Sequence, residues 1–323
     1  MLNKWKKAVI HVECATDREH FYDKTKRDRE LIEKLESEEI SQEEFMKESL
    51  MIWGESRDKR LWGTALFLIS NSKRYLATAR HVVWDEKSAE REFQEEMERA
   101  KLLPEHARRD FLQSAQERKQ NRIFSIIFRV PSLDEIISKD EDVIPSFLMN
   151  LGAGVTASHP YTFSIEEIDL AVISLDHRPI DSQFADELLE RGYEPISLED
   201  INDEPTQEGS EVFTVGFPGS ISFLGTLNRH PTEVKWASNR YSLPAFAFGK
   251  VSMLNEELFC FWADMSVYPG NSGGPVVEDD KLVGIVIRGT LSANLFPFGL
   301  IAKAKYIFDL IEQQEQKDNF FPP

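Results

Sequence analysis

Residues 268–277 read YPGNSGGPVV, and the rest of the chain is best understood from this segment. Three glycines surround Ser272, and glycine lets the backbone adopt positive φ or pass close to a neighbouring group. Such a turn would expose the Ser272 hydroxyl and let the amides of Gly270 and Ser272 converge on one point, as an oxyanion hole requires. The alternative is a glycine-rich hairpin in which the serine only caps the turn. The remaining sequence decides between the two.

The composition indicates a globular protein whose partners are neither nucleic acids nor membranes. The chain has 323 residues, of which 41% are hydrophobic, so it can bury one large core or two modest ones. Its formal net charge of −18 disfavours binding to nucleic acids and anionic lipids. The sequence contains no apolar run of about 18 residues, so we expect no membrane-spanning helix.

The N-terminus and the cysteines both favour a cytoplasmic location. The basic start, residues 1–7, is followed by an apolar run that is too short for a signal peptide. Cys14 and Cys260 lie in apolar, strand-like runs, so we expect buried free thiols. A secreted enzyme of this size would usually carry several disulfides. We expect neither a cofactor nor a metal ion.

The N-terminal half alternates between strands and charged helices. Strands are predicted at residues 8–15, 63–69, 74–79, 123–130 and 168–175, with residues 70–73 forming a hairpin turn. Helical blocks are predicted at residues 16–60 and 84–121. Ser41 begins a capping box in the first block, and Pro104 lies in the first turn of a helix in the second. Residues 131–160 have the composition of a loop.

The C-terminal half is nearly all β. A polar, proline-containing segment, residues 181–208, is predicted to connect two domains that span residues 1–180 and 209–323. The predicted strands of the second domain are residues 211–217, 233–240, 246–253, 258–265, 274–277, 282–288 and 299–303. A helix at residues 305–314 and an unstructured tail at residues 319–323 end the chain.

This distribution of strands predicts an all-β fold. Many short strands separated by turn signals are typical of barrels and sandwiches. The residues outside the helical blocks suffice for two six-stranded antiparallel β-barrels packed side by side. Two helical insertions and a C-terminal helix would complete the molecule.

A serine nucleophile needs a base and an acid that orients the base, and the chain offers a candidate for each. His81 follows a run of small residues at the end of the strand at 74–79. Asp169 is the only charge at the head of the apolar run 169–173, and a charge entering a buried strand needs a partner. A structural histidine and a turn-capping aspartate are the alternatives, and Asp176, at the far end of that strand, fits the capping role better.

Three segments resemble, in order, the His, Asp and Ser motifs of chymotrypsin-like serine proteases: TARH (78–81), DLAV (169–172) and GNSGGP (270–275). Residues 211–219 and 264–272 are most similar to the HtrA/Deg branch of this family. The resemblance implies a chymotrypsin-like pair of barrels and covers the strands but not the helical blocks.

The resemblance implies a serine endopeptidase that cleaves protein or peptide substrates through an acyl-enzyme. Ser272 would be the nucleophile, His81 the general base and then acid, and Asp169 the partner that orients the imidazole. The amides of Gly270 and Ser272 would form the oxyanion hole. A catalytically silent binding module and an esterase or other acyl hydrolase on the same fold remain alternatives.

The sequence departs from the family pattern in three ways. Asn271 replaces the acid that would receive a newly formed N-terminus, so we do not expect activation by propeptide cleavage. We expect no PDZ module after the predicted C-terminal helix. The helical blocks are insertions, and they could gate the active site, bind a regulatory protein or be inert decoration.

The resemblance also places a pocket for the P1 side chain of the substrate. Ser266, six residues before Ser272, corresponds to the pocket floor, and Gly289 and Gly299 correspond to its walls. An uncharged floor would bury a basic side chain without a partner. We therefore expect cleavage after large apolar residues (Phe, Tyr, Leu or Met), although the neighbouring Arg288 could favour acidic side chains in the substrate.

Overall fold

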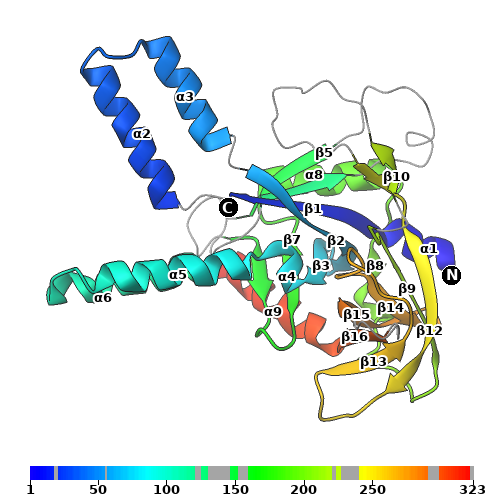
Figure 1. Ribbon diagram of the computed structural model, residues 1–323. Coiled ribbons are helices and arrows are strands. Elements are labelled where there is room, and N and C mark those ends of the chain that lie inside the picture. Colours follow the sequence, from blue (N-terminus) through cyan, green and yellow to red (C-terminus); the bar gives the residue numbers. More distant parts are fainter. Residues whose placement is uncertain are drawn as a thin grey trace.

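The computed structural model describes residues 1–17, 21–54, 57–120, 125–129, 146–151, 159–219, 223–226, 240–289 and 298–320. In these ranges the strands form one large sheet, one closed barrel and a short two-stranded ribbon (Figure 1). Two helical hairpins project from the side of this β body (Figure 1). No helix of the described residues is long and apolar enough to cross a membrane.

The large sheet has eight strands and comes from the N-terminal part of the chain. Its order is β5-β4-β1-β2-β3-β7-β6, all antiparallel, and β8 pairs in parallel with β2. The strands are β1 (Val9–Asp17), β2 (Arg57–Ser70), β3 (Lys73–Ala79), β4 (Ser125–Arg129), β5 (Ser146–Asn150), β6 (Tyr161–Phe163), β7 (Leu170–Ser174) and β8 (Ile196–Ser197).

The C-terminal strands form the closed barrel, in the order β12-β13-β16-β15-β14-β9. They are β9 (Glu211–Gly216), β12 (Ala245–Met253), β13 (Cys260–Asp264), β14 (Pro275–Glu278), β15 (Lys281–Gly289) and β16 (Phe298–Lys303). The ribbon outside the barrel consists of β10 (Phe223–Thr226) and β11 (Arg240–Ser242). One of the two expected six-stranded barrels is therefore present.

The other expected barrel is not found in the described part of the chain, because the large sheet does not close. β4 pairs with β1 along residues 11–15 and extends the sheet outward to β5, whereas closure would require the two outermost strands to meet. β5 also lies within residues 131–160, for which we expected a loop. β5 is a strand because it pairs with β4, and the composition of residues 131–160 does not reveal this pairing. The division of the chain at residues 181–208 stays a prediction.

Several other elements match or extend their predicted bounds. The hairpin turn at residues 70–73 is confirmed, since Asn71 and Ser72 have positive φ values of 48° and 66° and Ser70 pairs with Lys73. Two consecutive left-handed residues match the right-handed twist of the flanking strands. The C-terminal helix, α9 (Lys305–Phe320), runs past its predicted end and into the expected tail. Of the predicted strand at 233–240, all but Arg240 lies outside the described residues.

The sequence did not predict the helix at the N-terminus, and it indicated only a short helical segment, without bounds, within residues 176–208. The segment 181–208 overlaps a regular helix, α8 (Pro179–Glu190), whose first residue is a proline at a position where the backbone N–H needs no partner. At the N-terminus, α1 (Leu2–Ala8) buries Trp5 completely. The indole Nε1 of Trp5 donates a hydrogen bond to Asp280 at 2.7 Å, which ties the N-terminus to the barrel.

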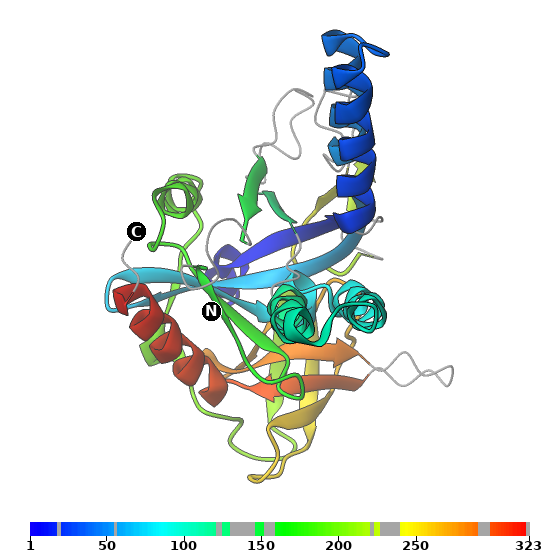
Figure 2. The same ribbon diagram turned by 90° about the vertical axis from the view of Figure 1, so that its left-hand side faces the viewer.

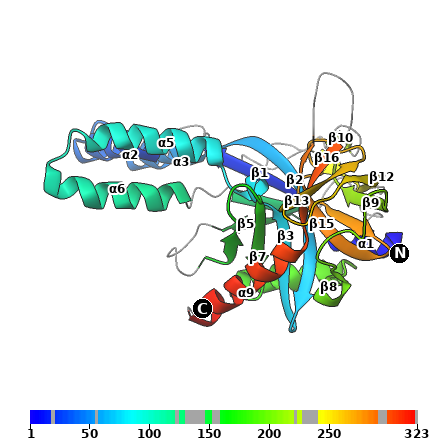
Figure 3. The same cartoon turned by 90° about the horizontal axis from the view of Figure 1, so that it is seen from below.

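The two helical blocks are hairpins of paired helices. The first contains α2 (Phe21–Glu36) and α3 (Gln42–Gly54), and the capping box is confirmed by reciprocal bonds between Ser41 and Glu44. The second contains α5 (Glu86–Ala100) and α6 (Glu105–Gln120). Both project from the same side of the β body (Figure 3). Figure 2, in which α5 and α6 are seen nearly end-on, shows that the two hairpins diverge.

One apolar core joins the large sheet to the barrel. It contains Leu66 and Leu76 from the sheet and Val215 and Ile285 from the barrel, all fully buried. Both cysteines are free and buried, as expected, and burial raises the pKa of the Cys14 thiol. The continuous core fixes how the ends of the sheet strands face the loops of the barrel, and the candidate site lies at this junction.

Candidate active site

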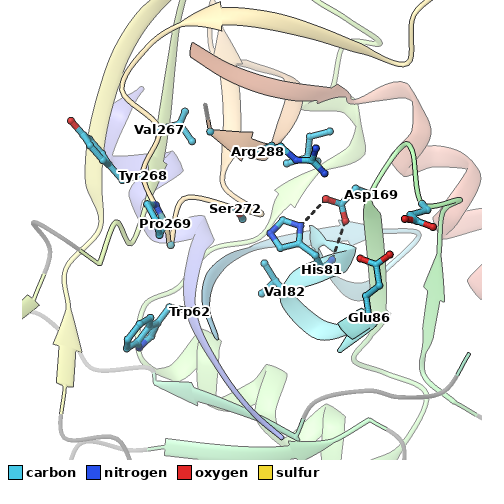
Figure 4. A pocket seen from close by; sticks show the side chains of 14 residues that line it. Trp62, His81, Val82, Glu86, Asp169, Val267, Tyr268, Pro269, Ser272 and Arg288 are labelled. Atoms are coloured by element: carbon cyan, nitrogen blue, oxygen red, sulfur yellow. Dashed lines mark hydrogen bonds and ion pairs between the residues drawn. The ribbon is translucent and has the colours of Figure 1, made fainter. Parts of the chain in front are cut away.

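His81 and Asp169 are brought together by strand register. β3 ends at Ala79, and the short helix α4 (Arg80–Val83) that follows carries His81. β7 pairs antiparallel with β3, with Ala79 opposite Leu170, so the residue before β7 lies beside the residue after β3. The Asp169 carboxylate accepts a hydrogen bond from the His81 backbone N–H at 3.0 Å, and its other oxygen lies 2.7 Å from His81 Nδ1 (Figure 4).

The backbone of Asp169 is also specialised. Its φ of 57° lies in the left-handed region, which aspartate tolerates better than most residues. This conformation lets its carbonyl oxygen accept a hydrogen bond from Arg80 N–H at 2.9 Å while its side chain binds His81. The Asp169 side chain is 13% exposed and that of His81 is 39% exposed. A largely buried acid therefore holds an accessible imidazole.

The alternative acid, Asp176, lies at the other end of β7 and binds Arg74. It accepts hydrogen bonds from the Arg74 backbone N–H at 2.7 Å and from Nε at 3.0 Å. Burial alone would raise the pKa of Asp176, but the hydrogen bonds from Arg74 outweigh it and hold the pKa below its usual value. Asp176 is thus part of a structural ion pair.

The loop around Ser272 requires glycine at two positions. Gly270 has a φ of 103° and Gly273 a φ of 86°. A Cβ on Gly270 would lie 2.2 Å from the carbonyl oxygen of Phe217, and one on Gly273 would lie 1.9 Å from that of Thr64. At each position, the positive φ and the close approach of a carbonyl oxygen exclude any residue other than glycine unless the backbone rearranges. Both glycines therefore determine the backbone conformation of the loop around Ser272.

Hydrogen bonds fix the orientation of this loop. The Pro269 carbonyl accepts from Gly219 N–H at 2.9 Å, and in a trans peptide the next N–H, that of Gly270, points the opposite way. Buried Thr64 donates from Oγ1 to the Gly270 carbonyl at 2.8 Å. Within the described residues, no protein acceptor takes the amide hydrogens of Gly270 and Ser272. Two such amides can receive a developing oxyanion.

Five of the seven candidate residues line one cavity of about 480 Å³. The predicted site residues that line the cavity are His81, Asp169, Gly270, Ser272 and Gly289. Nine further residues line it that the sequence analysis did not place there or mentioned only as neighbours: Trp62, Val82, Glu86, Glu166, Val267, Tyr268, Pro269, Ile287 and Arg288 (Figure 4). The cavity places the serine and the histidine in one substrate-sized space.

Two of the three predicted pocket residues do not line this cavity. Ser266 instead lines a neighbouring cavity of about 260 Å³ beside Phe246 and Phe248. Gly299 packs against Val267, whose Cγ2 would lie 2.8 Å from a Cβ at that position, and a Cβ on Gly289 would lie 2.8 Å from the Val267 carbonyl oxygen. The space expected between the two glycines is therefore filled in part by Val267.

Two glutamates next to the predicted pair were missed. Glu86 begins α5 and Glu166 lies in the turn before β7, and both line the cavity. A hydrogen bond to Glu166 and burial raise the pKa of Glu86. Each lies within five residues of His81 or Asp169, but a chain with 56 acidic residues gives no signal for these two in particular. Among the described residues, no group of three or more His, Cys, Asp or Glu side chains could hold a metal ion.

A family comparison matches most of the chain. The model of the trypsin-like peptidase domain matches residues 63–285, a range that includes His81, Asp169 and Ser272. A search of curated proteins finds no match.

Three solved structures with a similar course of the chain are titled as proteases or protease domains. The Rv3671c protease of M. tuberculosis in its active form is 11% identical, over 96% of this chain and 82% of that one, with a TM-score of 0.44. The MamO protease domain of Magnetospirillum magneticum is 14% identical, over 76% and 86%, with a TM-score of 0.39. The HtrA-type protease AlgW, solved with a decapeptide, is 12% identical, over 98% and 66%, with a TM-score of 0.45.

Proposed function

Since the chain belongs to the trypsin-like peptidase domain family, we propose that it is a serine endopeptidase with Ser272, His81 and Asp169 as its catalytic triad. The observation that carries this proposal is the His81–Asp169 pair, bonded at 2.7 Å, on the wall of the cavity that also contains Ser272. Residue types, chain order and shared cavity all fit acyl transfer by serine.

The proposed reaction has two halves. Ser272 Oγ attacks the scissile carbonyl while His81 Nε2 takes the hydroxyl proton, and the carbonyl oxygen becomes an oxyanion bound by the amides of Gly270 and Ser272. His81 then gives the proton to the departing amine, which leaves an acyl-enzyme. Water, deprotonated by the same imidazole, hydrolyses the ester and restores the serine. Asp169 holds the imidazole with its Nδ1 protonated and stabilises the imidazolium.

A fluorophosphonate probe tests the proposal directly. It should label the wild-type protein at Ser272 and should not label Ser272→Ala, because only an activated serine reacts. Absence of label on the wild type would favour a catalytically silent binding module. A labelled protein that hydrolyses esters but no peptide would favour the acyl-hydrolase alternative.

The P1 side chain is proposed to be apolar, with its size limited by Val267. Ile287, Gly289 and Val267 give the cavity an apolar wall, but Val267 occupies part of the room that a Phe or Tyr side chain needs. We expect Leu or Met to be preferred at P1, and Val267→Ala to raise kcat/KM for Phe relative to Leu by about tenfold. A P1 peptide library measures this, and Arg or Lys as the best P1 residue in the wild type would contradict it.

The helical hairpin α5–α6 is proposed to control access to the cavity. Its ends lie close together, since Trp84 Nε1 donates to the Lys119 carbonyl at 3.3 Å, and its first residue, Glu86, lines the cavity. Replacement of residues 87–118 by a short linker should leave the β body folded and raise the cleavage rate of a folded protein relative to that of a short peptide. Unchanged folding, activity and substrate range would show that the hairpin is inert decoration.

A further inference from the structure

The second cavity, of about 260 Å³, adjoins the segment that leads to Ser272. Ser266, Tyr268 and Asn271 line it from that segment, and residues 245–248 of β12 line it from the barrel. Tyr268 also lines the catalytic cavity, so the two cavities share a wall. Figure 4 shows the Tyr268 side chain directed away from the catalytic residues. The proposed chemistry makes no use of this second cavity.

The second cavity lies where β12 has no neighbouring strand on one side. β12 pairs with β9 over residues 245–250, but it pairs with β13 only from Lys250 onward. β13 ends at Asp264, and among the described residues no backbone hydrogen bond joins residues 245–248 to residues 266–271. In an antiparallel sheet, alternate residues direct their N–H and C=O groups to opposite edges. The edge of β12 at residues 245–248 therefore faces the cavity rather than another described strand.

Asn271 presents an unpaired donor to this cavity although the residue is only 1% exposed. Its Oδ1 accepts a hydrogen bond from Tyr268 N–H at 3.4 Å. Because a backbone N–H can only donate, the amide oxygen must face Tyr268, and the NH₂ group is directed away from it. Within the described part of the chain, no group accepts a hydrogen bond from Nδ2 of Asn271. A buried donor without an acceptor is unfavourable, so the cavity favours a ligand that supplies one.

The lining of the cavity indicates the chemical class of this ligand. Asn271 is uncharged, so its NH₂ group suits a carbonyl oxygen better than an ammonium group. Phe246 and Phe248 stack with their ring centres 6.2 Å apart, and Phe248 is 64% exposed, so the rings offer an apolar surface. An extended polypeptide supplies main-chain groups for the edge of β12, a carbonyl for Asn271 and an apolar side chain for the two rings.

We propose that the second cavity binds a short extended segment of another polypeptide, which adds to the edge of β12 at residues 245–248 and stabilises the loop around Ser272. Asn271 lies between the two residues whose amides form the proposed oxyanion hole. Its own N–H donates to the Tyr268 carbonyl at 2.9 Å, and its carbonyl accepts from Gly274 N–H at 2.8 Å. A ligand held by its side chain therefore restrains the loop. This regulation rests on the proposed endopeptidase function, whereas the binding site does not.

Fluorescence anisotropy on Ser272→Ala measures binding without cleavage. The probes are labelled hexapeptides of Thr and Ser, capped at both ends, that carry Val, Leu, Phe or Ser at the third position. We expect saturable binding that is tighter with an apolar third residue than with Ser. N-methylation of alternate amides should weaken binding by about tenfold, because it removes hydrogen bonds to β12. No saturable binding of any apolar peptide up to about 1 mM would overturn the proposal.

Asn271→Asp, placed in the Ser272→Ala protein, tests the unpaired donor. The carboxylate keeps the shape of the side chain and can still accept from Tyr268 N–H, but it offers no hydrogen to a ligand carbonyl. The affinity for the capped peptides should fall by about tenfold. Asn202→Asp is the matched control, since it adds the same charge at an exposed residue that lines neither cavity. Equal affinity of Asn271→Asp and Asn202→Asp for the peptides would contradict the site.

Phe248→Ser separates this cavity from the catalytic one, because Phe248 lines only the former of the two. The variant should bind the apolar peptides several-fold more weakly and keep the wild-type KM for a Leu-P1 substrate. Met253→Ser is the control, since Met253 is exposed on the same strand but does not line the cavity. Peptide binding that survives both Phe248→Ser and Asn271→Asp would place the peptide elsewhere and overturn the proposal.

The rate at which the fluorophosphonate probe labels Ser272 tests the regulation. Bound peptide should raise this rate several-fold in the wild type, and the increase should be lost in Phe248→Ser. Peptide binding that leaves the labelling rate unchanged would refute the regulation. If the probe does not label the wild type with or without peptide, the endopeptidase proposal fails, and the anisotropy measurements still decide whether the second cavity binds polypeptide.

Discussion

Ser272→Ala and His81→Ala should each lower kcat by about 10⁴- to 10⁶-fold with the fold intact, because nucleophile and base act as a unit. Neither side chain belongs to the apolar core that joins the sheet to the barrel, so the free energy of unfolding should change little. Steady-state kinetics on a Leu-P1 peptide and thermal unfolding of the same samples measure both quantities. A loss of kcat below about tenfold in either variant would contradict the triad.

Within the same prediction, Asp169→Asn separates the two candidate acids. An amide in place of the carboxylate cannot hold the imidazole in the required tautomer, so kcat should fall by about 10⁴-fold. Asp176→Asn is the matched control, because Asp176 binds Arg74 at the opposite end of β7. It should weaken the fold at neutral pH and leave kcat nearly unchanged. A large loss of kcat in Asp176→Asn together with a small loss in Asp169→Asn would show that Asp176, and not Asp169, is the catalytic acid.

The second large effect concerns the oxyanion loop. Gly270→Ala places a methyl group where a Cβ would lie 2.2 Å from the Phe217 carbonyl oxygen, at a φ of 103° that alanine rarely adopts. Relief of this clash must move the peptide that carries the Gly270 N–H. We expect kcat to fall by about 10²- to 10³-fold, the loss that follows removal of one oxyanion donor. KM for short peptides should change less.

Gly209→Ala is the control for backbone strain alone. Gly209 also has a left-handed φ, 85°, but a Cβ there meets no atom within 4 Å. Both variants should therefore lose some stability, and only Gly270→Ala should lose kcat. Thermal unfolding monitors the first effect, and fluorophosphonate labelling of Ser272 shows whether the nucleophile is still presented. Full kcat in a folded Gly270→Ala protein would exclude this amide from the oxyanion hole.

The sequence by itself determined the features that depend on local chemistry. Only glycine accepts the backbone of residues 270 and 273, so the loop around Ser272 was readable from its composition. The placing of Asp169 followed from the cost of burying an unpaired charge, and the structure brings it to His81. The turn at residues 70–73 and the capping box at Ser41 could be predicted for the same reason, because few residue types fit these positions. The family could be recognised from the His, Asp and Ser motifs, where the residue types are restricted in the same way.

Tertiary structure alone decided the features that depend on contacts between distant segments. Closure of a sheet depends on which edges meet, and the pairing of β1 with β4 joins strands more than one hundred residues apart. The cavity wall combines Val267 with Glu86 and Glu166, whose neighbours in the sequence give no sign of this meeting. Val267 occupies the expected P1 space because a glycine leaves room for whatever side chain packs against it. Periodicity and composition report the environment of a residue along its own strand or helix, whereas specificity arises where loops from separate strands converge.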